Sequence, residues 1–285
     1  MKPHAFDYQR VTNADEAVAA LAALGEDARI LAGGQSLMAV MNMRLAEPQR
    51  LIDISRSASL AEVRIDNGWL HIGAAATQAS IEWRPQLASE VPLLALAFPH
   101  ISHFQIRNRG TVCGSIAHAD PSAELPLCLV ALEGEVVLRN AKRRRSVKAS
   151  DFFTGMLLTA RAADEMVEAV RFPLARSGAG HGFEEFAMRH GDFAVCAIAA
   201  VADAKRLRIA VGGVADRPIA RDLPILSGTA LADALNEFAW FLDARDEPQA
   251  SAALRRRLVR ELGRRAAEQA LADRTPNGNL SGSLA

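Results

Sequence analysis

The feature that most constrains the fold of this chain is the segment 29–37, which reads Arg-Ile-Leu-Ala-Gly-Gly-Gln-Ser-Leu. Its apolar half predicts a strand, Gly33-Gly34 predicts a tight turn, and residues 36–45 predict a helix. A strand that passes through glycines into a helix directs several backbone N–H groups to one place, and the helix N-terminus adds partial positive charge there. The segment therefore suits a phosphate or diphosphate group. Glycines also form such turns in proteins that bind nothing, so two interpretations stay open at this point.

The composition predicts an ordinary globular protein of about two domains. Of its 285 residues half are apolar, and 33 basic side chains balance 33 acidic ones, so no excess of charge indicates nucleic acid or an anionic membrane as a partner. No apolar run reaches the length of about 18 residues that a membrane span needs, and the N-terminus lacks the apolar core of a signal peptide, so we expect a cytoplasmic protein. Cys113, Cys128 and Cys196 do not have the spacing of zinc or iron–sulfur ligands, so we expect no metal in this chain.

The N-terminal residues predict a small parallel α/β unit. A helix is expected over 12–24, with Asn13 and Glu16 as a capping-box pair and Gly25 at its end. Strands at 29–32 and 51–54 flank the expected helix at 36–45, and this strand–helix–strand order is typical of parallel pairing.

The rest of the chain predicts mainly antiparallel strands with helices. Asn67-Gly68 lies between two alternating segments, which is the strongest short-range signal for a hairpin. Thr77 predicts the start of a short helix, and the basic run 142–145 predicts a solvated loop. Residues 173–182, rich in Gly, Ala and Ser, predict a linker. The other expected elements are strands at 135–139, 168–172, 183–187, 194–202 and 207–212, and helices at 86–98, 229–244 and 250–271.

A second glycine segment, residues 105–126, carries an unusual density of small and polar groups. Gly110, Gly114 and Ser115 permit close approach of a ligand, while the side chains of Thr111, Ser115, His118, Asp120 and Glu124 offer partners for ribose or ribityl hydroxyls. Alone, this segment is also consistent with a polar turn around an Asp-Pro bend. Two such segments in one chain favour a large cofactor with a diphosphate and several hydroxyls, because such a cofactor needs several loops to hold it.

Together these segments resemble the FAD-binding medium subunit of molybdenum hydroxylases. That family includes the flavoprotein subunits of carbon monoxide dehydrogenase and of xanthine dehydrogenase-like and N-heterocycle dehydrogenases. The resemblance rests on the segments 32–37, 105–115 and 117–126, and it continues through 191–194, 211–218 and 251–256. It covers residues 1 to about 273, and the two glycine segments in this order and spacing make it specific.

The resemblance implies an α+β fold in two parts. Residues 1–175 are expected to form a two-lobed FAD-binding domain of the vanillyl-alcohol-oxidase type, with a small α/β lobe at 1–55 and an α+β lobe at 56–175. Residues 180–274 are expected to form a small α+β domain with an antiparallel sheet and helices, followed by a flexible tail at 275–285.

By the same resemblance, the backbone of the first glycine segment wraps the FAD diphosphate, and the second segment contacts the diphosphate and the ribityl chain. Two acidic residues of the second segment take places where the family holds the cofactor, and the backbone near Val167 and residues 186–190 lie close to the isoalloxazine. The expected cofactor-binding residues are Leu31, Ala32, Gly33, Gly34, Gln35, Ser36, Leu37, Thr111, Val112, Cys113, Gly114, Ser115, Asp120, Glu124 and Val167.

Two places depart from the family pattern. Cys113-Gly114-Ser115 stands where the family commonly has Gly-Gly-Asn or Gly-Gly-Asp, so Ser115 reaches less far and Cys113 needs a negative φ or a local adjustment. Ala187 stands where some relatives carry a basic residue near the flavin, which bears on the flavin potential. A cysteine beside a flavin suggests covalent attachment, but we expect Cys113 to be a buried thiol instead.

The implied function is electron transfer within an oxidoreductase of several subunits. A molybdopterin large subunit is expected to hydroxylate the organic substrate, an iron–sulfur small subunit with [2Fe-2S] clusters to relay electrons, and FAD on this chain to pass them to an external acceptor. The expected assembly is a dimer of heterotrimers, and no residue of this chain is expected to be catalytic. Two alternatives stay open: a self-contained flavin oxidase, which needs a larger substrate-binding cap, and a noncatalytic scaffold with the same fold.

Overall fold

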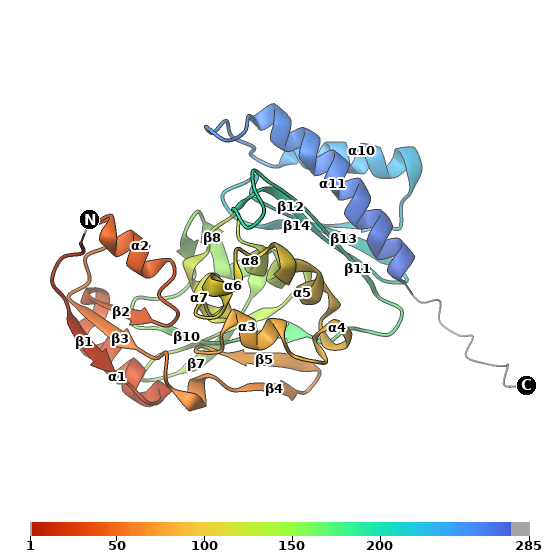
Figure 1. Ribbon diagram of the computed structural model, residues 1–285. Coiled ribbons are helices and arrows are strands. Elements are labelled where there is room, and N and C mark those ends of the chain that lie inside the picture. The colour runs from red at the N-terminus through yellow and green to blue at the C-terminus, as the bar shows by residue number, and fades with distance from the viewer. Residues whose placement is uncertain (1, 275–285) are drawn as a thin grey trace, which may run out of the picture.

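The first residues form the parallel unit that the strand–helix–strand pattern predicts. In the computed structural model, which describes residues 2–274, β1 (Asp7–Arg10), β3 (Arg50–Asp53) and β2 (Ala28–Leu31) make a three-stranded parallel sheet in that order (Figure 1). The sequence did not predict β1, because its side chains are mostly exposed and show no apolar alternation.

Local signals set the two helices of this unit. In α1 (Ala14–Leu24) the Asn13 side chain accepts a hydrogen bond from the Glu16 N–H, as predicted, but the Glu16 carboxylate accepts from the N–H of Thr12 rather than that of Asn13. The second helix, α2 (Leu37–Asn42), is shorter than the expected 36–45. It ends because Arg44 takes a left-handed conformation with φ of 58°.

An antiparallel five-stranded sheet follows, in the order β4, β5, β10, β6, β7. The predicted hairpin is confirmed, with Asn67 and Gly68 both at positive φ as a type I′ turn requires. The prediction of a solvated basic loop is wrong for its second half, because Arg144 and Arg145 lie in β7 and bind carboxylates at Glu168 and Glu165. The strands are β4 (Val63–Asp66), β5 (Trp69–Gly73), β6 (Glu135–Arg139), β7 (Arg144–Lys148) and β10 (Met166–Pro173).

Short helices cover one face of this sheet (Figure 1). The single helix expected over 86–98 is broken at Val91, because Pro92 disfavours the helical conformation of the residue before it. All eight residues of α8 are buried, so this helix is central to the molecule. The elements are α3 (Gln78–Glu82), α4 (Leu87–Glu90), α5 (Pro92–Ala97), α6 (Phe104–Arg107), α7 (Val112–His118), α8 (Glu124–Ala131), α9 (Ala149–Phe152), β8 (Phe153–Gly155) and β9 (Leu158–Thr159), with one-turn 3-10 helices η1 (Gly25–Asp27), η2 (Ala58–Leu60) and η3 (Phe98–His100).

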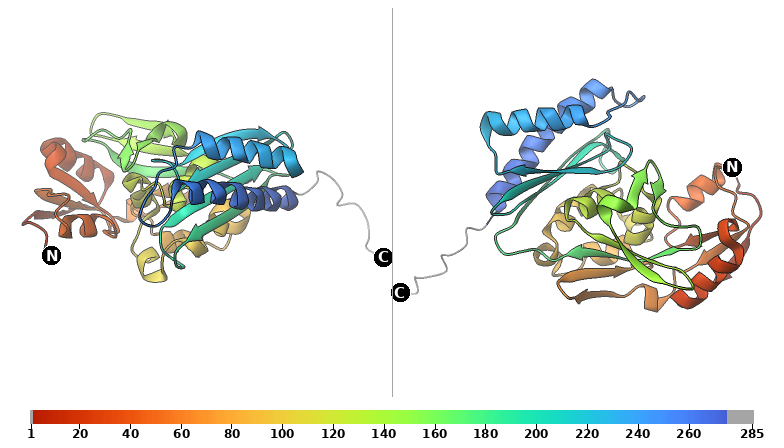
Figure 2. Two further views of the ribbon diagram at one scale, coloured as in Figure 1. Left: turned by 90° about the horizontal axis from the view of Figure 1, so that it is seen from above. Right: turned by 180° about the vertical axis from the view of Figure 1, so that it is seen from behind.

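The C-terminal residues form a four-stranded antiparallel sheet with two helices on its outer face (Figure 2). Alternate residues of β12 join two separate cores: Ala197 and Ala199 pack toward α8, while Cys196 and Ile198 pack toward α10 and α11. The elements are β11 (Gly180–Ala187), β12 (Ala194–Ala202), β13 (Arg206–Gly212), β14 (Ile219–Pro224), α10 (Gly228–Phe241) and α11 (Ala252–Asp273).

The connection between the two parts is shorter than the predicted linker, because β11 already begins at Gly180. The glycines of this segment allow close packing: a Cβ on Gly180 or Gly182 would overlap a backbone carbonyl of α11. None of the helices within residues 2–274 is long and apolar enough to cross a membrane. The predicted flexible tail lies outside the described residues.

Candidate functional site

The two glycine segments, far apart in sequence, lie against each other. A Cβ on Gly33 would overlap the carbonyl oxygen of Arg109 and would lie 2.7 Å from the Cα of Gly110. Glycine at position 33 is therefore required by the approach of the two loops, and not only by the turn itself. The structure brings together the first loop (residues 32–36, between β2 and α2) and the second loop (residues 108–111, between α6 and α7).

The first loop presents backbone donors that have no partner among the described residues. Gly34 takes a positive φ of 75°, which turns the chain from β2 toward α2. No acceptor within residues 2–274 receives a hydrogen bond from the backbone N–H groups of residues 33–37, although these residues are half-buried. Half-buried N–H groups at a helix start are chemically suited to an anion, because they carry partial positive charge.

The second loop is held by a helix cap and an ion pair. Thr111 precedes α7, and its hydroxyl accepts a hydrogen bond from the N–H of Gly114 at 2.9 Å. Arg107 on α6 makes two hydrogen bonds, 2.7 and 2.9 Å long, to the carboxylate of Glu82 on α3. The position of this loop relative to the five-stranded sheet is thereby fixed by α3 and α7.

The side chains that follow Thr111 point into the core. Val112 and Cys113 are buried, so only their backbone can contact a cofactor. Cys113 adopts a helical conformation, burial raises the pKa of its thiol, and its Sγ lies 3.4 Å from the carbonyl oxygen of Ile72. This confirms the expected buried thiol. Gly114 and Ser115 are half-buried, and a Cβ on Gly114 would lie 2.7 Å from the Thr111 hydroxyl, so glycine here accommodates the cap.

Asp120 and Glu124 are joined by a tight turn that leads into α8. Asp120 accepts a hydrogen bond from the N–H of Ser122 at 2.9 Å, which is an Asx turn, and its carboxylate is partly accessible. Glu124 begins α8 with only 5% of its surface exposed. Burial, with a smaller contribution from the negative charge of Asp120, raises the pKa of Glu124 to about 7.

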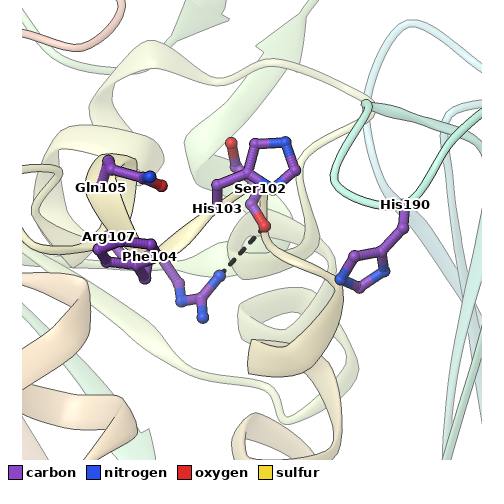
Figure 3. Close-up of a pocket in the computed structure, with 6 residues that line it drawn as sticks. All are labelled: Ser102, His103, Phe104, Gln105, Arg107 and His190. Carbon is purple, nitrogen blue, oxygen red and sulfur yellow. Dashed lines mark hydrogen bonds between the residues drawn. The ribbon is translucent and has the colours of Figure 1, made fainter.

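The residues expected near the isoalloxazine lie in two different places. Val167 is buried in β10, at a β-bulge of the strand, and α7 packs against this strand. Residues 186–190 end β11 and begin its connection to β12, and Phe186, Met188 and Phe193 there are exposed. His190 lines a pocket of about 370 Å³ together with Ser102, His103, Phe104, Gln105 and Arg107 (Figure 3).

Two side chains in this part of the molecule, Gln78 and Glu185, were not predicted from the sequence. Gln78 on α3 lies beside Gly110, and its Oε1 is buried without a partner among the described residues. Glu185 and His100 approach each other, with 3.9 Å between the Glu185 Oε1 and the His100 Nδ1. Nothing local in the sequence marks them, because each is brought to the site by tertiary packing.

The described residues fit FAD. The unpaired N–H groups of the first loop suit a diphosphate, the unpartnered Oε1 of Gln78 lies beside the second loop, and the carboxylates of Asp120 and Glu124 can accept hydrogen bonds from hydroxyl groups. Within residues 2–274, no group of three or more His, Cys, Asp or Glu side chains lies close enough to hold a metal ion.

Comparison with known proteins identifies the family of this chain. Residues 4–175 match the family described as the FAD binding domain in molybdopterin dehydrogenase. The chain is 40% identical over 254 residues to the nicotine 6-hydroxylase medium subunit of Paenarthrobacter nicotinovorans, covering 84% of this chain and 88% of that one. It is 37% identical over 225 residues to the caffeine dehydrogenase subunit beta of Pseudomonas sp. strain CBB1, covering 77% and 76% of the two chains.

The fold is similar over almost the whole chain to a solved structure. A chain of carbon monoxide dehydrogenase from Hydrogenophaga pseudoflava superposes with a TM-score of 0.90 at 30% identity, covering 96% of this chain and 100% of that chain. The chain thus belongs to the FAD-binding medium subunits of the molybdenum hydroxylases, and it is a subunit of an oxidoreductase.

Proposed function

We propose that this chain is the electron-exit subunit of its complex, receiving electrons from an iron–sulfur subunit and passing them to an external acceptor. The observation that carries the proposal is the run of unpaired, half-buried N–H groups at residues 33–37, held against the second glycine loop. FAD, when bound, supplies the two-electron chemistry, and the protein supplies its position and electrostatic surroundings.

The chain's residues hold the cofactor in three ways. The backbone of Leu31, Ala32, Gly33, Gly34, Gln35, Ser36 and Leu37 binds the diphosphate through N–H groups. Thr111 and the backbone of residues 112–115 contact the diphosphate and the ribityl chain, and the carboxylates of Asp120 and Glu124 accept from cofactor hydroxyls. Val167 and residues 186–190 border the isoalloxazine. No residue of the chain transfers groups to an organic substrate.

The domain organisation that we propose follows the two cores. Residues 1–175 form the FAD-binding domain, with lobes 1–55 and 56–175 of the vanillyl-alcohol-oxidase type, and residues 180–274 form the C-terminal domain. The parallel sheet lies in the first lobe, the five-stranded sheet in the second, and the four-stranded sheet beyond the connection. The family match to residues 4–175 supports the first boundary.

The partners that we propose are an iron–sulfur small subunit and a molybdopterin large subunit, in a dimer of heterotrimers in the cytoplasm. Support comes from relatives whose names describe a medium subunit or a beta subunit. The related carbon monoxide dehydrogenase is described with the Mo-pyranopterin moiety of a molybdenum cofactor.

Metal and flavin analysis of the complex tests this proposal. The chain, tagged and purified from its native host, is expected to bring with it molybdenum, iron and FAD in a fixed ratio, and its organic substrate is expected to reduce the flavin only in the complex. Oxidation of an organic substrate by the FAD-loaded chain alone would identify a self-contained oxidase. A chain without FAD, molybdenum or iron would identify a scaffold.

A further inference from the structure

The start of α3 is joined to the second loop by backbone contacts. The N–H of Gln78 donates a hydrogen bond to the carbonyl oxygen of Gly110 at 2.7 Å, and Thr77 and Thr111 pair as an antiparallel β-bridge. The hydroxyl of Thr77 caps α3 by accepting from the N–H of Ser80 at 3.1 Å. These contacts set the position of the Gln78 side chain relative to the second loop.

The Gln78 side chain lies where the two glycine loops meet. Its Nε2 and Cδ lie 3.4 and 3.5 Å from the place that a Cβ of Gly110 would take. On the first loop, a Cβ of Gly33 would lie 2.7 Å from the Cα of the same Gly110. Gly110 is thus a close neighbour of both Gly33 and the amide of Gln78.

The amide of Gln78 is buried with an unpaired oxygen. Only 6% of the residue is exposed, and its Oε1 has no hydrogen-bond partner among the described residues. The N–H groups of Arg109 and Gly110 are not available to it, because both donate to the carbonyl oxygen of Ile106, at 3.1 and 2.7 Å. Buried side-chain polar atoms almost always have a partner, so the unpaired Oε1 indicates a bound molecule at this place.

The chemistry of the unpaired atom selects the part of FAD that fits it. A carbonyl oxygen only accepts hydrogen bonds, so its partner must carry a proton to donate. The oxygens of a diphosphate are ionised at neutral pH and have no such proton, whereas the hydroxyl groups of the ribityl chain have one. The last torsion of a glutamine side chain is broad, so the amide can turn its oxygen toward a ligand bound between the loops.

We propose that Gln78 binds the ribityl chain of FAD, with its Oε1 accepting a hydrogen bond from a ribityl hydroxyl. This rests on the proposed function, in which FAD is the cofactor and the second loop contacts its ribityl chain. Gln78 supplies an uncharged acceptor beside the carboxylates assigned to Asp120 and Glu124. An amide holds a hydroxyl group without placing a further negative charge near the diphosphate.

The FAD affinity of Gln78→Met tests the proposal. Methionine has a similar length and flexibility, so this substitution removes the acceptor and keeps the packing. The cofactor-free full chain is titrated with FAD, and flavin fluorescence reports binding. We expect a dissociation constant about tenfold above that of the wild type, which is the effect of one lost hydrogen bond.

The matched control is Gln86→Met, which makes the same substitution at another helix start. Gln86 is exposed before α4, and its side chain makes no capping hydrogen bond. Its FAD affinity should equal that of the wild type.

An altered cofactor locates the contact. An FAD analogue whose ribityl hydroxyls are replaced by hydrogen atoms should bind the wild type more weakly than FAD does. This loss is expected to be about tenfold smaller in Gln78→Met, because the acceptor is already absent there. ADP carries the diphosphate and the ribose of adenosine but no ribityl chain, so it should bind the wild type and Gln78→Met equally.

The stability of the cofactor-free chain distinguishes cofactor binding from a purely structural role. Gln78→Met removes a buried polar atom that has no partner, so urea unfolding should show it to be at least as stable as the wild type. Lower stability with unchanged FAD affinity would show that Gln78 serves folding alone, and would overturn the inference.

The remaining outcomes differ in what they refute. If FAD binds the wild type and Gln78→Met equally, or the ribityl hydroxyls matter equally in both chains, the ribityl contact is refuted and the proposed function stands. Equal weakening of ADP and FAD in Gln78→Met would place the side chain at the adenosine part and contradict the inference. A wild-type chain that binds no FAD refutes the proposed function and the inference together.

Discussion

At the scale of single residues, the adjacent Gly33 and Gly34 are needed for different structural reasons. Position 33 is a packing position, since any Cβ there overlaps the backbone of the second loop. Position 34 is a conformational one: its φ is 75°, and a Cβ would meet only the side chains of Leu31 and Met38, at 3.2 and 3.4 Å. A substitution at position 34 therefore strains the backbone of the first loop without separating it from the second loop.

The first prediction distinguishes the packing requirement at position 33 from the conformational requirement at position 34. Gly34→Ala is expected to weaken FAD binding at least tenfold, with a loss of stability of about 1 kcal/mol from left-handed strain. Gly33→Ala is expected to lose both FAD binding and several degrees of melting temperature. FAD fluorescence titration and thermal unfolding measure the two effects.

The matched control for this prediction is Gly25→Ala. Gly25 also has a positive φ, of 55°, but no atom lies within 4 Å of a Cβ there, and it precedes β2, whereas the first loop follows this strand. It should lose stability as Gly34→Ala does and keep its FAD affinity. Equal FAD affinity in Gly34→Ala and Gly25→Ala would contradict the assignment of the first loop.

Residue patterns predicted part of the site and could not predict the rest. The two glycine segments were found because backbone constraints appear directly in sequence, as at Gly34 and at the Asn67-Gly68 turn. Gln78 and Glu185 were not predicted, because their surroundings come from residues distant in sequence. The sequence predicted Gly33 as part of a tight turn. It could not predict the close packing of Gly33 against Arg109, because that contact depends on the tertiary fold.

At the scale of elements, α7 is the helix on which the second loop depends. Its N-cap, Thr111, is buried, and its hydroxyl accepts from the N–H of Gly114. We predict that Thr111→Ala costs about 1 kcal/mol of unfolding free energy and weakens FAD binding, because the cap also fixes the loop. Urea unfolding measures the first effect and FAD titration the second.

Thr111→Ser serves as the control for this prediction, because serine keeps the capping oxygen. It should retain most of the stability and most of the FAD affinity. If Thr111→Ala bound FAD as tightly as Thr111→Ser, the link between the cap and the cofactor loop would be refuted.

Elements with strong local signals were predicted, and elements set by packing were not. The hairpin at Asn67-Gly68 and the helix after Thr77 were predicted because their turn and cap residues are specific. The break before Pro92 was missed because the apolar pattern continues through it. The start of β11 was mistaken for a linker, since Gly180 and Gly182 serve close packing against α11.

At the scale of the whole molecule, Glu185 of β11 is a buried carboxyl group between the first part of the chain and the C-terminal sheet. Its side chain is 4% exposed, and its Oε2 has no hydrogen-bond partner among the described residues. The pKa of Glu185 is raised from its ordinary value of 4.5 to about 8, so the folded state holds a proton that the unfolded state releases. The stabilisation is complete below about pH 4.5 and is lost as the pH rises through about 8.

We therefore predict that the free energy of unfolding falls as the pH rises from 7 to 8.5, above the range in which histidines titrate. Urea unfolding at a series of pH values measures this fall in the wild type, and Glu185→Gln should flatten it. Glu184→Gln is the control, because the neighbouring Glu184 is partly exposed and its carboxylate accepts a hydrogen bond from Gln269 of α11, so this variant should keep the wild-type slope. Parallel slopes in the wild type and Glu185→Gln would show that Glu185 is already ionised in the folded protein.

The FAD content of the purified chain tests the central claim most directly. Protein concentration and the FAD released on denaturation, separated by chromatography, give the number of FAD molecules per chain. One FAD per chain is predicted for the wild type, with a lower content for Gly34→Ala. A colourless chain that leaves the fluorescence of added FAD unchanged would contradict the claim that its two glycine loops hold this cofactor.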